Sequence, residues 1–92
     1  MLELVLSKAY KKAFKKLSQS GGFNEDKLIM VVYKLLKEEK LEERYQDHAL
    51  NGPLLEHRDC HVCNDIILVY KINKTLGTLT LSDIGSHSDL FE

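Results

Sequence analysis

Hydrophobic and polar positions follow two different periods along this chain, and the change falls near its middle. The opening stretch LELVL is short and apolar and predicts a strand. After it, Tyr10, Phe14 and Leu17 recur at the spacing of one helix face. Ser7 is a residue type that caps helix starts, and Gly21 is one that ends helices, so the pattern predicts a helix between them.

A second helix is predicted over residues 24–40, where Leu28, Val32 and Leu35 form an apolar stripe. Asn24 can cap its first turn, and two acidic residues follow where the helix dipole is positive. Residues 41–53 then break the helical pattern, because the segment is polar and closes on the turn signal NGP. We therefore expect two helices followed by a connection.

Three strand-like segments fill the second half of the chain. Residues 54–62 are the most polar, residues 65–72 are almost entirely apolar and β-branched, and residues 76–84 alternate between apolar and polar positions. The order β-α-α-β-β-β, with a short C-terminal turn, predicts an α+β fold in a single domain over residues 1–92. In this fold two N-terminal helices pack on an antiparallel sheet of about four strands.

The length and composition of the chain fit one small domain. Its 92 residues, 43% of them hydrophobic, are enough for one modest core. No apolar run approaches the roughly 20 residues of a membrane span. The start of the chain also lacks the basic-then-apolar order of a signal peptide. We therefore expect a cytoplasmic protein, with no membrane partner, whose two cysteines stay reduced.

Charge is unevenly distributed, although the formal net charge is only −1. The basic residues of the first helix include Lys8, Lys12 and Lys16, which lie on one stripe of its surface. A solvated helix face explains such a stripe, and contact with RNA or with an acidic partner segment explains it equally well. Lys12 and Lys16 are therefore candidate substrate-binding residues.

Ionisable residues gather in the second half of the chain, which holds all four histidines. In a three-strand meander the segments that carry them are neighbours, so His48, His61 and His87 can line one cleft with the turn residue Asp65. Two histidines can share general acid and base roles, because the unperturbed pKa of histidine lies near neutrality. RNA supplies its own nucleophile, the 2′-OH, so its cleavage by histidines and a cation requires no metal, cofactor or small-molecule ligand.

Four motifs make the chain resemble a known toxin family. The motifs are YQDHALNG, RDCHV, DIILVYKI and GSHSDLF. Together they resemble the YafQ-like branch of the RelE/ParE toxin superfamily, and the order of the N-terminal elements extends the resemblance over nearly the whole chain. It implies a RelE-like fold and a type II toxin–antitoxin toxin that acts as a ribosome-associated mRNA endoribonuclease, or mRNA interferase. It also implies a cognate antitoxin that wraps the toxin.

The resemblance implies site residues as well. Carried over motif by motif, the implied catalytic group is His48, His61, Asp65 and His87. The closing aromatic residue, Phe91, is implied to contact a base, where stacking is worth roughly 1–3 kcal/mol. The sequence leaves open which histidine is the base and which is the acid.

The chain departs from the family pattern on the substrate side. The family typically has an Arg two residues before the Gly of the GSH motif, where this chain has Asp83. An Asp there replaces a stabilising cation by an anion that repels phosphate. Ile66 stands where the family often has Trp, and Leu54 and His57 stand in a family stretch that is rich in aromatic residues.

Strand alternation raises two questions about these positions. It places Asp83 on the buried face of Leu79 and Leu81, unless the strand has ended or a β-bulge turns the side chain outward. Arg58 is a candidate substitute cation, but alternation places it on the opposite face from His61.

Three other functions stay open on sequence grounds. The first is a catalytically weakened toxin fold that only binds an antitoxin. The second is a gyrase-inhibiting toxin of the same superfamily, against which the retained histidines argue. The third is a zinc protein built on Cys60 and Cys63, but a single CxxC pair is a weak signal for zinc. We expect the cysteines to be structural or incidental and no metal to be bound.

Overall fold

The computed structural model describes residues 1–21, 23–50 and 56–91. Its elements in chain order are β1 Glu3–Leu6, α1 Lys8–Ser18, α2 Glu25–Leu36, the 3₁₀ helix η1 Glu43–Tyr45, β2 His48–Ala49, β3 Arg58–Cys63, β4 Ile66–Asn73, β5 Thr78–Ser86 and α3 His87–Phe91. None of the helices in these three ranges is long and apolar enough to cross a bilayer.

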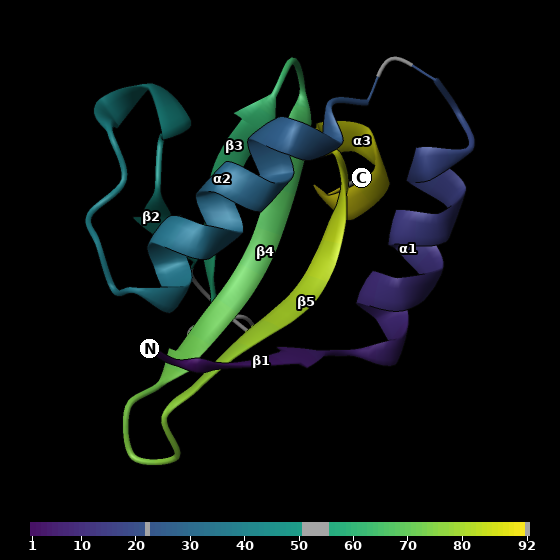
Figure 1. Cartoon of the computed structure of the whole chain (residues 1–92). Coiled ribbons are helices and arrows are strands. Elements are labelled where there is room, and N and C mark those ends of the chain that lie inside the picture. Colours follow the sequence, from purple (N-terminus) through teal and green to yellow (C-terminus); the bar gives the residue numbers. More distant parts are fainter. Residues whose placement is uncertain (22, 51–55, 92) are drawn as a thin grey trace.

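The strands form one five-stranded sheet in the order β1-β5-β4-β3-β2 (Figure 1). The α+β class is confirmed, and so is the pair of long helices on a mostly antiparallel sheet. The sheet has one more strand than expected, because residues 48–49 inside the predicted connection pair with β3. Two residues show no recognisable strand pattern, so only this pairing defines β2.

Three further features of the fold differ from the prediction. β1 runs parallel to β5, so one pair of the sheet is not antiparallel. The strand predicted over 54–62 begins at Arg58, and the first two residues of the prediction lie outside the described residues. The C-terminal turn is the short helix α3.

Both long helices start at the predicted caps. The Ser7 hydroxyl accepts a hydrogen bond from the Tyr10 amide at 3.0 Å, and the Asn24 side chain accepts one from the Lys27 amide at 3.2 Å. Ser7 Oγ also donates to the Ser82 carbonyl at 2.8 Å. This bond fixes the start of α1 against β5.

The main core lies between the long helices and one face of the sheet. In Figure 1, α2 crosses in front of β3 and β4, and α1 lies beside β5. The sheet contributes fully buried side chains to this core, among them Leu68, Tyr70 and Leu79, and α2 contributes Leu28 and Val31. Burying each such side chain stabilises the fold by roughly 1.5–3 kcal/mol.

Two β-bulges change which side chains share a face. In β3 the register shifts between His61 and Cys63, and in β5 Val69 pairs with Asp83 while Tyr70 pairs with Leu81. The second shift leaves Ser82 as an extra residue and turns Asp83 away from the face of Leu81. The bulge alternative for Asp83 is therefore correct, and β5 continues to Ser86.

Candidate active site: histidines around a buried aspartate

The sheet register places the candidate site on the face opposite the two long helices. His48 of β2 pairs with Asp59 of β3, Asp59 pairs with Val69 of β4, and Val69 pairs with Asp83 of β5. His61 lies two residues beyond Asp59 on the same strand, so it points to the same side. Residues from four strands thus form one row, in which His48, Asp59 and Asp83 are polar and Val69 is apolar, with His61 beside it.

A buried carboxylate lies at the centre of this group. Asp59 is only 3% exposed, and burial raises the pKa of its carboxyl above the usual range. The charges of His48, His61 and His87 oppose this shift and favour a lower pKa, so all three imidazoles lie within electrostatic reach of Asp59. The structure therefore brings together three of the four implied catalytic residues.

Asp59 is the site residue that sequence reasoning missed. The signal was available, because Asp59 and His61 alternate along one strand whose other positions are apolar or cysteine, apart from Arg58 at its start. Its burial depends on strand pairing on both sides, which the polar appearance of residues 54–62 did not suggest.

The geometry at His48 defines its tautomer. The ring Nδ1 lies 2.8 Å from the Gln46 carbonyl oxygen and 3.1 Å from Asp59 Oδ1. A carbonyl only accepts, so Nδ1 carries the hydrogen, and in the neutral ring Nε2 is the nitrogen without one. The single hydrogen on Nδ1 is directed at the Gln46 carbonyl. Asp59 Oδ1 is therefore left without a hydrogen-bond partner among the described residues. The His48 side chain is 58% exposed, so Nε2 is accessible to a ligand.

The motif GSHSD forms a reciprocal helix cap that presents His87. The Ser86 amide donates to Asp89 Oδ2 and the Asp89 amide donates to Ser86 Oγ, both at 3.2 Å. The backbone hydrogen bond from Ser86 lowers the pKa of Asp89, with further lowering by its side chain and by Lys16. A Cβ on Gly85 would lie only 3.1 Å from Asp89 Cβ, so this close packing of α3 on β5 favours glycine.

Phe91 lies one helical turn after His87. The two rings are 5.2 Å apart between centroids and tilted by 53°. Phe91 is 38% exposed, so its ring is available for stacking and does not close the core. The C-terminal motif therefore presents an imidazole and an aromatic ring side by side.

Asp65 lies at the exposed tip of the β3–β4 hairpin. No hydrogen bond or ion pair joins it to the three histidines within the part of the chain that the structure describes. The structure does not bring Asp65 into the cluster, and its catalytic role stays a prediction.

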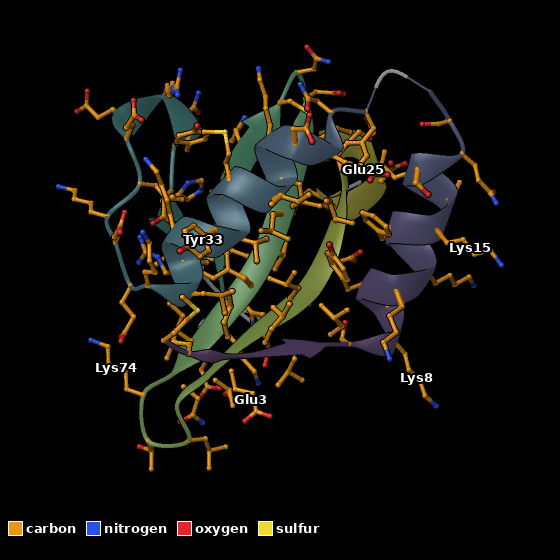
Figure 2. All side chains as sticks on the ribbon, in the orientation of Figure 1. Glu3, Lys8, Lys15, Glu25, Tyr33 and Lys74 are labelled. Carbon is orange, nitrogen blue, oxygen red and sulfur yellow. The ribbon has the colours of Figure 1, made fainter. Side chains whose placement is uncertain are left out.

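Cations lie on two sides of the cluster. Lys16 lines a cavity of about 470 Å³ between α1, β5 and α3, together with Asp83 and Ser86. Lys12 lies one turn earlier on α1 and is exposed. The basic character of this helix is visible in Figure 2, where Lys8 and Lys15 point away from the sheet.

A second cavity, of about 370 Å³, opens beside His61. It is lined by Lys27 of α2 and Arg44 of η1, with Gln46 and Asn64. Arg44 also forms a 3.5 Å ion pair with Glu42, so part of its charge is already paired. Lys27 is exposed and has no ion pair with a described residue.

Arg58 does not supply the cation that would bind phosphate at this site. Its Nε is 3.2 Å from Asp47 Oδ1, and it pairs across the sheet with Tyr70, whose side chain belongs to the helix-side core. The bulge of β3 lies beyond His61 and does not change the face of Arg58. The sequence expectation that Arg58 and His61 face opposite sides is correct.

The two cysteines face the helix-side core. The bulge at Val62 brings Cys60 and Cys63 to the same face, where both are free and buried. Burial raises the pKa of Cys60 to about 12, so its thiol stays protonated and unreactive. No group of three potential metal ligands occurs among residues 1–21, 23–50 and 56–91.

Sequence comparison links the chain to known toxins. A protein assigned as a YafQ toxin of Haemophilus influenzae is 39% identical over 64 residues, which cover 67% of this chain and 63% of that protein. The mRNA interferase toxin YafQ of Escherichia coli is 43% identical over 47 residues, which cover 51% of this chain and 49% of that protein. The chain thus spans about half to under two thirds of the length of these curated relatives.

Solved structures match over the full chain. A metal-bound toxin from Helicobacter pylori is 43% identical with a TM-score of 0.91, and the match covers 99% of this chain and 100% of that one. The E. coli DinJ–YafQ complex gives 29% identity and a TM-score of 0.87, with all of both chains covered. The model of the family described as "Bacterial toxin of type II toxin-antitoxin system, YafQ" matches residues 2–92. This chain therefore belongs to the YafQ family of type II toxin–antitoxin toxins.

Proposed function

We propose that this chain is a cytoplasmic, ribosome-associated mRNA endoribonuclease that works without a metal. The observation that carries the proposal is the gathering of His48, His61 and His87 around the buried carboxylate of Asp59. The family supplies the toxin class, and the E. coli relative is named an mRNA interferase. The clustered imidazoles supply acid–base chemistry suited to RNA.

The proposed reaction uses the 2′-OH of the RNA as nucleophile. One histidine removes the 2′-OH proton, the 2′-oxygen bonds to phosphorus, and the bond from phosphorus to the 5′-oxygen breaks. A second histidine gives its proton to the leaving 5′-oxygen, so the products are a 2′,3′-cyclic phosphate and a 5′-hydroxyl. His48 suits the first role, because its Nδ1 hydrogen is held by Gln46 and its Nε2 is free.

Three of the remaining implied residues bind substrate in this proposal. Phe91 stacks on a base next to His87, which its 38% exposure permits. Lys12 and Lys16 contact backbone phosphates from α1. Asp65 keeps its catalytic role in this proposal, and it reaches the RNA from the tip of the β3–β4 hairpin once the RNA has bound.

The test of the function is cleavage of mRNA by the purified chain. We expect cleavage with ribosomes present, unchanged by EDTA, and 2′,3′-cyclic phosphate ends on the products. A His61→Ala, His87→Ala double variant is the inactive control. If the native chain and the double variant cleave equally, the proposal is wrong. Inhibition of DNA supercoiling by gyrase would instead support the gyrase-directed alternative.

Asp59→Asn gives a prediction about pH and stability. A carboxyl whose pKa is higher in the folded than in the unfolded state destabilises the fold above its unfolded pKa. The amide should therefore raise Tm near neutral pH, because it removes the cost of burying this charge. The gain should shrink near pH 3, where both states are largely protonated.

Calorimetry at the two pH values measures the change in Tm. The mRNA assay measures the effect of the same variant on cleavage. We expect slower cleavage by Asp59→Asn, because the negative charge that the three histidines face is lost. A more stable but slower protein would show that the buried charge is kept for function. A lower Tm at neutral pH would contradict the argument.

The antitoxin partner fits a groove on the helical side of the molecule. A nearly wholly apolar cavity of about 360 Å³ lies between β1, α1 and α2, lined among others by Leu4, Phe14 and Tyr33. Ile29 is 63% exposed and lies with other exposed apolar residues that line the cavity, and a contiguous apolar patch of this kind marks an interaction site. Tyr33 lies on the α2 side and Lys15 on α1 (Figure 2).

The basic residues beside this groove indicate that its binding partner carries acidic residues. The exposed Lys11 and Lys15 follow Tyr10 and Phe14 on the solvent side of α1. We therefore assign the groove to an amphipathic helix of the cognate antitoxin, with an apolar stripe and an acidic flank. The antitoxin partner itself is supported by the E. coli relative, whose complex with DinJ is known.

Ile29→Glu should weaken antitoxin binding by about 30-fold or more, the effect of losing a hot-spot contact of about 2 kcal/mol. The measurement is calorimetric titration with the purified cognate antitoxin. Leu76→Glu is the matched control, because Leu76 is 73% exposed in the β4–β5 turn and does not line the groove. Equal binding by both variants would exclude this groove. Cleavage of mRNA should be unchanged in both.

A further inference from the structure

A partly buried hydrogen-bond cluster is centred on Asp47, the residue before His48. The Tyr70 hydroxyl donates to Asp47 Oδ1 at 2.5 Å, and Arg58 Nε donates to the same oxygen at 3.2 Å. Tyr70 is 1% exposed. Burial and the hydrogen bond to Asp47 raise the pKa of Tyr70, so the hydroxyl remains a donor. These three residues come from the loop before β2, from β3 and from β4.

The residue between this cluster and η1 has an unusual backbone. Gln46 has φ 47° and ψ 44°, a left-handed conformation that non-glycine residues rarely adopt. Its amide donates to the Glu43 carbonyl at 2.9 Å, which holds it from the η1 side. Its own carbonyl meets His48 Nδ1 at 2.8 Å. Such strained backbone persists only where the surroundings fix it, and it concentrates at functional sites.

The strand that carries His48 needs such support. β2 has only two residues, and one strand pair of that length fixes a side chain poorly. Asp47 is the neighbour of both Gln46 and His48, and two donors from the sheet hold its side chain on the helix side. In the segment 46–48, Asp47 is therefore held on the helix side of the sheet, and the His48 imidazole lies on the opposite side.

We propose that Asp47, Arg58 and Tyr70 are positioning residues, a clamp that holds Gln46 in its left-handed conformation and so keeps His48 as the Nδ1–H tautomer with Nε2 free. The clamp makes no contact with RNA in this proposal and acts only through Gln46 and His48. Its catalytic consequence rests on the proposed function, but its effect on the His48 ring does not.

The test combines NMR of the ring with RNA cleavage. Three variants are compared with the native chain: Tyr70→Phe, which removes one donor, Asp47→Ala, which removes the acceptor, and Asp47→Asn, which keeps an acceptor oxygen. Nitrogen-15 labelling of histidine reports the tautomer and the pH titration of His48. Tyr10→Phe is the matched control, because Tyr10 is a buried tyrosine of α1 away from the site.

We expect Asp47→Ala to convert the His48 ring from Nδ1–H to a mixture of tautomers, with a smaller change in Tyr70→Phe and partial rescue in Asp47→Asn. In Asp47→Ala the cleavage rate at saturating RNA should fall about tenfold or more, with little change in KM. This loss is part of the roughly 10²–10⁴-fold rate increase that acid–base catalysis supplies. An unaltered His48 spectrum in folded Asp47→Ala and Tyr70→Phe would overturn the proposal. A changed spectrum with unchanged cleavage would confirm the clamp and argue instead against His48 as a catalyst.

Discussion

Replacing His87 by Ala is expected to lower mRNA cleavage by about 10²–10⁴-fold, the contribution of one general acid or base. His87 is exposed at the first position of α3, and its charge acts on the same buried carboxylate as those of His48 and His61. Its exposed ring contacts Phe91, so the side chain adds little to the core. The variant should therefore lose activity and keep its Tm.

The measurement is the initial rate of mRNA cleavage with purified ribosomes, beside thermal unfolding of the same samples. Ser88→Ala is the matched control, because Ser88 is the exposed next residue of the same helix. Its rate should match that of the native chain. A His87→Ala rate close to that of Ser88→Ala would remove His87 from the catalytic group and leave the chemistry to His48 and His61.

The pH dependence of the rate gives this prediction a second readout. An acid and a base acting together produce a bell-shaped profile, and removing one of them should flatten one limb. The limb that disappears in His87→Ala identifies its role.

Local patterns in the sequence predicted most of the fold. The caps at Ser7 and Asn24 and the helical spacing of Tyr10, Phe14 and Leu17 depend on neighbours in the chain, and the structure shows them as expected. β2 was not predicted, because its two residues are a strand only through pairing with Asp59 and Arg58. Local propensity contains no information about such a pairing.

The sequence named three histidines that lie near one another in the structure, but it did not identify the carboxylate between them. The motifs located His48, His61 and His87, which the structure gathers. Asp59 became central only because pairing on both sides buries it. The face of Asp83 depended on a bulge at Ser82, which a one-residue register shift creates and alternation alone cannot reveal.

Asp83→Arg is expected to raise mRNA cleavage by about 10²–10³-fold, the effect of one preorganised group that stabilises transition-state charge. Asp83 lies in the same row of the sheet as His48 and Asp59, on the face of the histidine cluster. A carboxylate there adds to the negative charge of Asp59 where the phosphate must bind. An arginine would remove the repulsion and supply a cation.

Asp83→Asn separates these two contributions. The amide removes the repulsion without adding a cation, and it keeps an acceptor for the Ile84 amide, which bonds to Asp83 Oδ1 at 2.9 Å. We expect an intermediate rate for Asp83→Asn and the highest rate for Asp83→Arg, measured at several salt concentrations because phosphate contacts weaken with salt. Equal rates in the two variants would show that repulsion alone limits the native chain.

An unchanged rate in Asp83→Arg would contradict the prediction and would mean that the cation comes from another element. Two candidates are available: Lys16, which faces Asp83 across one cavity, and Lys27, which lines the cavity beside His61. Lys16→Ala and Lys27→Ala would then distinguish them, since both side chains are exposed and neither contributes to the core. A gain in Asp83→Arg would instead show that the histidine cluster is complete, and that the acid at 83 holds the native toxin well below the rate that its fold permits.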